Sequence, residues 1–464
     1  MSLIIPANSA AASGGYVVAN SCRFDGTSAY LSRTQGTPTD IDKYTISVWF
    51  KRSALFNGSY QNIIGTDHQS VREAIRFNDD ADSLTWDFKN ASNTKSNITP
   101  NQLFRDVASW YNLVCIFDSA NGTANLRRRI FLNGTEITSF AAVTYNAQNE
   151  DGNLNKGGQN IVIGIPAAAN NFFSGYMSEF VFVDGQALTP DGNFGEFDED
   201  SGIWKPIDVS GLTFGNNGFY LDFEDSGDLG DDESGNGNDF AETNLAAIDQ
   251  STDTCTNNFA TLNVLNKGTS VSLSEGNLAY TAPSGSFASV LSTIGFSQGK
   301  WYVEYQWKSG SNSHVGIGKE NINYNHYLSY TANGYSYYKD GRKFNNSSAS
   351  SYGNSYAVDD IIGVALDLDN GAIWFSKNGT WQNSATLTEI QNGTTTNAAF
   401  TSLSGEFFFG TGMGNSNELA YFNFGSPPYS ESGGETDGNG YGNFAHEVPS
   451  GYYSLNTKNL AEYG

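Results

Sequence analysis

The sequence predicts an all-β protein built from two β-sandwich domains in tandem. Three observations support this class. Short runs along the chain alternate apolar and polar side chains with a period of two, as half-buried strands do. The 464 residues include 51 Gly and only 10 Pro, with 14% aromatic residues, which is typical of many short strands joined by tight turns. No segment shows a helical period, and the chain is long enough for two domains.

The first domain is expected to span residues 21–224, after an N-terminal arm at residues 1–20. Its run at 44–50 reads YTISVWF, and this alternation predicts a strand that is packed on both sides. Asn133 and Gly134 both tolerate a positive φ and therefore predict a hairpin turn. Further strands are expected at residues 110–117, 129–137, 161–165 and 176–183.

An acidic, Gly-rich connector is expected at residues 225–262. Residues 222–239 are nearly all Gly, Asp, Glu, Ser or Asn, a composition that favours a linker. Period-two runs return in the second domain, residues 263–426. A C-terminal tail follows at 427–464, and its aromatic residues favour docking on a folded surface. Strands of the second domain are expected at residues 300–307, 314–318, 335–339, 360–367, 372–381, 406–410 and 419–424.

The strong negative charge excludes some classes of partner. The formal net charge is −25 and the pI is about 4.3, so nucleic acid and anionic membrane surfaces are disfavoured. The N-terminal region lacks a positively charged segment and a long apolar run, so no signal peptide is expected, nor is a membrane-spanning segment. The three cysteines are far apart and predict no disulfide framework.

Two parts of the chain resemble known families. Residues 24–190 resemble a concanavalin A-like, laminin-G-type domain, through TISVWFKR at 45–52, the strand that begins WY at 110, IFLNGTEI at 130–137 and FFSGYMSEFVFVDGQALTP at 172–190. Residues 299–382 resemble a SPRY domain, through GKWYVEYQW, VGIG, YSYYKDGRK and DDIIGVALDLDNGAIWFSKNGTW. Asp359 and Asp360 stand where that family usually has Gly-Asp. Both resemblances imply β-sandwiches that bind ligands.

The combination of segments resembles structural proteins of tailed bacteriophages. The segments are IIPANSAAASGG, GQALTP, SGIWKP, LGDDESGNGNDF and TNNFATLN. The resemblance implies a non-enzymatic virion component, such as a fibre, a spike or a capsid decoration, at the virion surface. Its implied partners are other virion proteins and a host-surface glycan or protein, and a cyclic homo-oligomer, such as a trimer, is expected. An intracellular SPRY-type peptide-binding module and a glycan depolymerase remain as alternatives.

One acidic run resembles the catalytic motif of some glycosidases. Glycoside hydrolysis needs two carboxylates placed on either side of the sugar bond. The run at 196–200 reads EFDED, close to the ExDxE pattern of some concanavalin-like hydrolases, although its last acid is Asp and its flanks are typical of a loop. We therefore expect a solvated acidic turn at Glu196, and no catalytic residues.

A calcium ion is the one cofactor that the sequence suggests. Hard oxygen ligands at close spacing, together with flexible Gly, suit Ca²⁺, although the spacing is not that of an EF-hand loop. The same composition is typical of a flexible acidic linker. The candidate ligands are Asp228, Asp231, Asp232, Asn236, Asn238 and Asp239.

A ligand-binding site is expected in an Asn-rich loop of the second domain. Tyr324, His326, Tyr327 and Tyr330 lie close together there. Sugars stack on exposed aromatic rings, with polar neighbours that fix their orientation, and the SPRY resemblance leaves a protein ligand equally open. The alternative is that these rings only pack against one another.

Overall fold

The computed structural model describes residues 15–464 except 56, 57, 59, 67–70, 79, 80, 91, 93, 94, 166–171, 283, 284, 286, 415, 416 and 432. The chain forms two compact units, the N-terminal unit (Ala10–Thr256) and the C-terminal unit (Asn257–Gly464). Antiparallel sheets dominate both units, which confirms the all-β prediction. In the described part of the chain, no helix has the length and apolar character that crossing a membrane requires.

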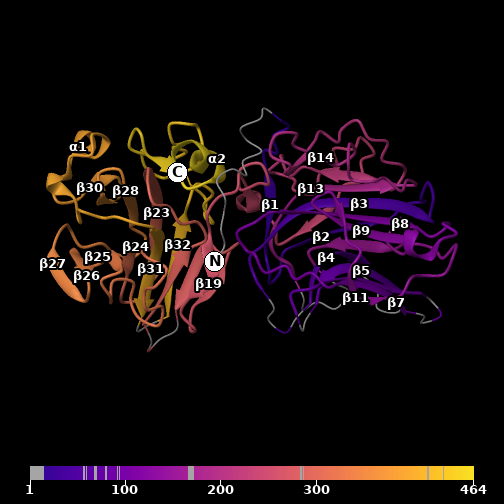
Figure 1. The fold of residues 1–464 in the computed structure, drawn as a ribbon, viewed down its shortest axis with the longest axis horizontal. Helices are drawn as coiled ribbons and strands as arrows, with labels where there is room; N and C mark the ends of the chain where they lie inside the picture. Colours follow the sequence, from indigo (N-terminus) through magenta and orange to yellow (C-terminus); the bar gives the residue numbers. More distant parts are fainter. Residues whose placement is uncertain are drawn as a thin grey trace. The chain divides into compact units, whose positions relative to one another are not determined.

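Two large sheets form most of the N-terminal unit (Figure 1), and β14 and β15 pair in a separate two-stranded sheet. The first runs in the order β10 (Thr135–Glu136), β9 (Arg128–Leu132), β8 (Tyr111–Asp118), β3 (Lys43–Arg52), β13 (Ser174–Asp184), β1 (Ser21–Asp25) and β18 (Gln250–Ser251), with β16 (Phe219–Leu221) also on β13. The second runs β11 (Phe140–Val143), β7 (Lys95–Pro100), β6 (Leu84–Lys89), β5 (Arg72–Phe77), β4 (Gln61–Thr66), β12 (Asn160–Ile163), β2 (Tyr30–Thr34) and β17 (Ala241–Thr243). Shorter elements are β14 (Gly195–Phe197), β15 (Trp204–Pro206), η3 (Ala124–Leu126) and η4 (Ala247–Asp249).

Strand β3 shows why the first sheet is buried on both faces. Ile46, Val48 and Phe50 point into the core between the two sheets. On the opposite face of the same sheet, Val181 of β13 packs with Phe214 in a second apolar layer. The expectation that this strand packs on both sides is therefore confirmed, and every residue of β3 after Lys43 is buried.

Most of the segment expected to be a connector, residues 225–256, is part of the N-terminal unit. Leu229 and Phe240 lie in its core, β17 pairs with β2, and β18 pairs with β1. The boundary between the units falls after Thr256, inside the expected connector, so residues 225–256 belong to the N-terminal unit and residues 257–262 to the C-terminal unit. The Gly- and Asp-rich composition wrongly predicted a linker. Two buried apolar side chains anchor this segment to the core, and its polar side chains form hydrogen bonds within its own turns.

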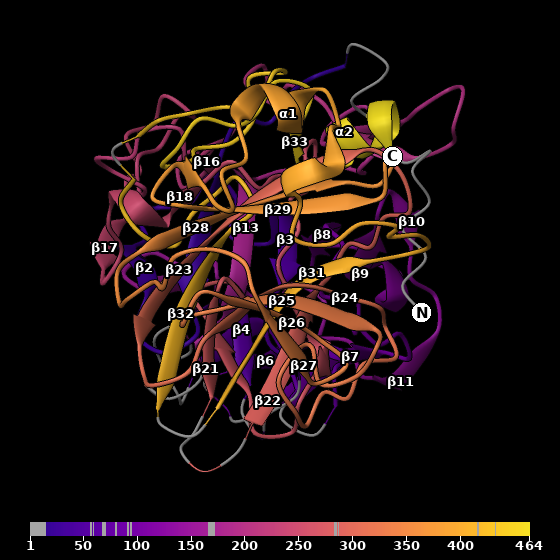
Figure 2. The ribbon, with the colours of Figure 1, turned by 90° about the vertical axis from the view of Figure 1, so that its left-hand side faces the viewer.

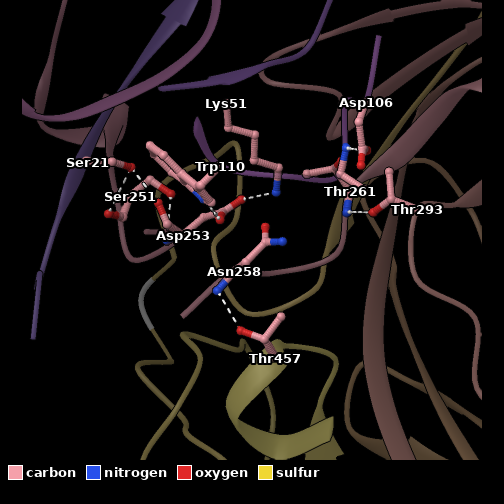
Figure 3. A network of polar contacts seen from close by, with 11 residues as sticks. Ser21, Lys51, Asp106, Trp110, Ser251, Asp253, Asn258, Thr261, Thr293 and Thr457 are labelled. Atoms are coloured by element: carbon pink, nitrogen blue, oxygen red, sulfur yellow. Dashed lines mark hydrogen bonds and ion pairs between the residues drawn. The ribbon is translucent and has the colours of Figure 1, made fainter. Parts of the chain in front are cut away.

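A buried ion pair holds the end of this unit in place (Figure 3). Lys51 Nζ lies 2.7 Å from Asp253 Oδ2, and both side chains are almost wholly buried. The indole Nε1 of Trp110 donates to the other carboxylate oxygen at 3.0 Å. Ser21 Oγ donates to the Asp253 carbonyl at 2.7 Å, and the Asp253 N–H donates to Ser251 Oγ at 3.1 Å. These bonds tie the last residues of the unit to β1 through Ser21 and to β3 through Lys51.

The C-terminal unit is a second sandwich (Figure 2). One sheet runs β19 (Leu262–Lys267), β22 (Phe287–Ser292), β31 (Phe408–Gly414), β24 (His314–Gly318), β25 (Gly334–Tyr338), β26 (Arg342–Asn345) and β27 (Ser348–Ser351). The other runs β20 (Ser272–Ser274), β21 (Ala279–Ala282), β32 (Glu418–Asn423), β23 (Lys300–Ser309), β28 (Ile361–Asp367), β29 (Ala372–Lys377) and β30 (Thr380–Trp381). The short helices are α1 (Leu387–Gln391), η5 (Thr395–Asn397) and α2 (Thr457–Tyr463).

The segment expected to be a C-terminal tail is integrated into this second sandwich. Strand β33 (Tyr453–Ser454) pairs in parallel with β23. Phe444 and Tyr452 are fully buried in an apolar layer on the outer side of that sheet, and Leu455 lies in the main core. The aromatic residues therefore dock on the unit to which they belong. Of the expected N-terminal arm, residues 1–14 lie outside the described residues.

Candidate functional site

The loop between β24 and β25, residues 319–333, folds over the outer face of its own sheet. Glycine makes this possible, because a Cβ at Gly412 would lie 2.3 Å from the backbone nitrogen of Leu328. Hydrogen bonds then fix the loop. Ser289 N–H donates to the Tyr324 carbonyl at 2.8 Å, and the hydroxyls of Ser329 and Ser336 lie 2.6 Å apart. These hydrogen bonds hold the loop against the outer face of the sheet.

Aromatic side chains from the loop and from the sheet meet on this face. The His326 ring stacks on Tyr330, with centroids 3.4 Å apart and planes at 10°, and lies parallel to Phe287 at 5.5 Å. Tyr327 stacks on His314 at 4.9 Å. Tyr330 is 40% exposed. We call this set the aromatic cluster; it comprises Phe287, His314, His326, Tyr327, Tyr330, Tyr338 and Phe344.

The cluster is uncharged near neutral pH. Burial lowers the pKa of His314 to about 3 and also lowers the pKa of His326, so both imidazoles are neutral. The Arg342 guanidinium lies 5.0 Å from the Phe344 ring centroid, and its charge is balanced by Asp340 at 2.6 Å. Neutral rings beside hydroxyl and amide groups suit a ligand with an apolar face and polar edges.

Three of the four residues expected to form the site come together. His326, Tyr327 and Tyr330 lie in the aromatic cluster, and the Tyr327 hydroxyl donates to Ser347 Oγ at 3.0 Å. Tyr324 does not join them. Its hydroxyl donates to the Glu320 carbonyl at 2.8 Å, and its ring packs against a small apolar group that includes Leu328.

The sequence analysis does not single out the members of the cluster that come from the sheet. The alternation of inward-facing and outward-facing side chains along each strand is the sequence signal that could identify them. In β24, Val315 and Ile317 point into the core, so His314 must face outward. Phe287 lies on β22, far away in the sequence, and only the pairing of β22 and β31 brings it near the loop. Strand order, which a single sequence does not reveal, was needed to find it.

The acidic segment expected to bind calcium is occupied by its own hydrogen bonds. The Asp232 carboxylate accepts from the N–H groups of Tyr220, at 2.9 Å, and Asn238, at 2.8 Å. The Asn238 side-chain oxygen accepts from the Arg33 guanidinium, where a cation would be repelled. Among the described residues, no group of three or more His, Cys, Asp or Glu side chains could hold a metal ion. The structure does not support the calcium prediction.

The other candidate calcium ligands also form hydrogen bonds within this segment or lie close to its carboxylates. Asp228 accepts from the Gly230 N–H at 3.2 Å, and Asp239 accepts from the Asp232 N–H at 3.2 Å. The Asn236 amide donates to the carbonyls of Gly215 and Gly218. The pKa of Asp231 is raised by partial burial and by neighbouring carboxylates.

The acidic run at 196–200 begins in β14, where Glu196 pairs with Lys205 of β15, and ends in the turn that follows, so Glu196 lies in a strand and not in the expected turn. Glu196 and Asp198 share Lys205 Nζ, at 3.2 and 3.3 Å. Asp198 also accepts from the N–H and the hydroxyl of Ser201, at 2.9 and 2.8 Å, which holds its pKa below the usual range. Two carboxylates on one cation do not flank a space for a sugar bond, as glycoside hydrolysis requires.

Comparison with family models finds both expected domains. The model described as the Concanavalin A-like lectin/glucanases superfamily, Laminin_G_3, matches residues 25–192, and the SPRY domain model matches residues 300–427. A concanavalin A-like domain and a SPRY domain are therefore present, one in each unit. Among curated proteins, the sequence has no significant match.

Solved structures with similar folds are distant in sequence. The SPRY domain of human HERC1 is 18% identical, with 35% of this chain and 96% of that chain covered and a TM-score of 0.29. A heptameric SAP-like pentraxin from Limulus polyphemus is 16% identical, with 38% and 80% covered and a TM-score of 0.29. A putative carbohydrate binding protein from Bacteroides ovatus is 16% identical, with 49% and 59% covered and a TM-score of 0.33. At these values the likeness indicates no function.

Proposed function

We propose that this chain is a non-enzymatic binding protein of a virion surface, and that the aromatic cluster binds a glycan or protein of the host surface. The observation that carries the binding role is the stack of His326 on the exposed Tyr330, held by a hydrogen-bonded loop. Both domain families are consistent with binding modules. The virion location rests on the five segments that resemble tailed-phage structural proteins.

A glycan is the ligand we favour for the aromatic cluster. A pyranose ring presents C–H groups on its face and hydroxyls at its edge. This matches the exposed Tyr330 ring, beside which Ser347 Oγ accepts from the Tyr327 hydroxyl and donates to the Tyr330 carbonyl. The non-enzymatic part of the proposal is supported by the pairing of Glu196 and Asp198 with Lys205. An intracellular peptide-binding module is the second candidate, favoured by the SPRY domain match alone.

Removal of the exposed ring should weaken binding without unfolding the protein. We expect Tyr330→Ala to bind its glycan roughly tenfold more weakly on a glycan array followed by a binding isotherm, a loss of about 1.4 kcal/mol. Tyr441→Ala, which truncates a half-buried tyrosine outside the cluster, is the control and should bind like the wild type. A bound glycan recovered at its original length supports a binder, whereas shortened chains would identify a depolymerase.

A further inference from the structure

Glu304 is a buried carboxylate on the outer face of the sheet that contains β23. Trp301, Val303 and Tyr305 of this strand point into the main core, so the side chains of Tyr302 and Glu304 point the other way. Glu304 is wholly buried, and in the described part of the chain it forms no ion pair. A buried carboxylate that lacks a cation depends on hydrogen bonds, and its ionised form is costly.

The neighbours of Glu304 do not compensate its charge. In the strand register, Gly363 of β28 and Asn423 of β32 lie beside it, and both are uncharged. The titratable groups that face it, among the described residues, are Tyr302, Tyr429, Glu431 and His446. Burial raises the pKa of both tyrosines and lowers the pKa of His446, so these three side chains are neutral near pH 7. Glu431 is a second acid, and the surroundings therefore favour protonated Glu304.

Residues 433–448 cross this face of the sheet, and we call them the strap. The Phe444 ring is fully buried and meets the Tyr302 ring edge-on at 5.2 Å. The N–H groups of Ala445 and His446 donate to the two carboxylate oxygens of Glu304, at 2.8 and 2.9 Å. Glu304 is thus covered by the same segment that supplies two of its hydrogen-bond donors.

A separate group of contacts holds the strap at its other end. Asp437 accepts from the Ser454 hydroxyl at 2.6 Å and from the Asn459 side-chain amide at 2.7 Å. These partners belong to β33 and α2. Because the two anchors are distinct, the Glu304 end can separate from the sheet while the Asp437 end stays bound.

Closure of the strap removes Glu304 from water and links closure to pH. Burial raises the pKa of Glu304 from 4.5 to about 7, and an open strap would return it toward its ordinary value. Between these two values the closed form binds more protons than the open form. The stabilisation of the closed form by this proton is therefore complete below about pH 4.5 and is lost as the pH rises through about 7.

We propose that the strap is a pH-sensitive element of the C-terminal unit, which is held closed in acid and opens more often as the pH rises toward 7. Opening exposes Tyr302 and Trp374, two rings of the apolar layer that Phe444 completes. Burial of Phe444 keeps the closed form the major one, and the charge on Glu304 sets how often the strap opens. This goes beyond the proposed function, because it involves no residue of the aromatic cluster and no ligand.

The test is hydrogen exchange of the full chain at pH 5.5 and pH 8.5, read by mass spectrometry, with exchange times scaled to the intrinsic rate at each pH. In the wild type, peptides that cover residues 442–448 should open roughly thirtyfold more often at pH 8.5, while peptides of β31 should not change. Glu304→Gln removes the titrating group, so this difference between the two pH values should vanish. Glu406→Gln makes the same change at an exposed glutamate and should keep the difference.

The dependence on pH separates this proposal from a purely structural role. A structural role alone predicts weaker protection in Glu304→Gln at both pH values, with the difference between them retained, and that result would overturn the proposal. Equal scaled protection of the wild-type strap at both pH values, or faster opening of the whole C-terminal unit, would also overturn it. If Glu304→Gln does not fold, the wild-type profile decides, because opening should rise between pH 5.5 and 7 and level off above it.

Discussion

Replacement of Glu73 by leucine is expected to lower the free energy of unfolding of the N-terminal unit by about 3–5 kcal/mol. The Glu73 carboxylate is wholly buried and accepts hydrogen bonds from the Tyr44 hydroxyl, from Trp86 Nε1 at 2.8 Å and from the N–H groups of Asn153 and Leu154 at 2.9 and 3.1 Å. Leucine would leave all four donors buried without an acceptor.

Loss of the Glu73 charge lowers the free energy of unfolding further. Arg128 is also buried, and its positive charge favours the ionised form of Glu73, although burial as a whole raises the pKa of Glu73. The Arg128 guanidinium is further held by the Trp86 carbonyl at 2.6 Å and lies 4.3 Å from the Trp86 ring centroid. With Glu73 gone, the buried Arg128 would lose the carboxylate whose charge acts on it most strongly, and a buried charge left uncompensated is costly.

Hydrogen exchange in urea, read by mass spectrometry, measures this effect for each unit separately. Peptides that cover β8 should lose protection at lower urea in Glu73→Leu, while peptides of β28 in the C-terminal unit should not change. Asp151→Asn, at a half-exposed carboxylate paired with Lys156, is the control, with an expected change within about 0.5 kcal/mol. A change of that size in Glu73→Leu would show that the buried network contributes little.

Replacement of Phe444 by alanine should destabilise the C-terminal unit by about 3–5 kcal/mol. The Phe444 ring is fully buried and meets Tyr302 edge-on at 5.2 Å. The next two residues, Ala445 and His446, donate their N–H groups to Glu304 at 2.8 and 2.9 Å. Burial raises the pKa of Glu304 to about 7. A cavity at Phe444 would therefore loosen the segment that satisfies a buried carboxylate.

The effect is measured by thermal and urea unfolding of the full chain. Phe444→Ala should unfold the C-terminal unit earlier, and limited proteolysis should cut within residues 427–464 before the rest of that unit. Tyr441→Ala, at a half-buried tyrosine three residues earlier, should have a much smaller effect. If the two variants behave alike, residues 427–464 are a tail that contributes little to the fold.

The sequence alone was enough to predict the fold class and many strands. Residues 314–318 were expected to be a strand and form β24 with the same bounds, and the strand expected at 44–50 lies within β3. Alternation works here because each strand has one face in a core. The two family resemblances are confirmed by the matched models.

Domain limits and the full site could not be predicted, for physical reasons that particular residues illustrate. Asp232 and Asn238 have the composition of a linker but cap turns of a folded segment. Composition does not reveal which hydrogen bonds form. Phe287 joins His326 only through strand pairing. Contacts between distant strands therefore determine the site.

The proposed location on a virion surface is tested most directly by cryo-electron microscopy of the intact particle that carries this chain. We predict density for both sandwich domains at the outside of the particle, on the capsid or at the tail, with the aromatic cluster accessible from solvent. Absence of the chain from purified particles would contradict the virion proposal and favour the intracellular peptide-binding module instead.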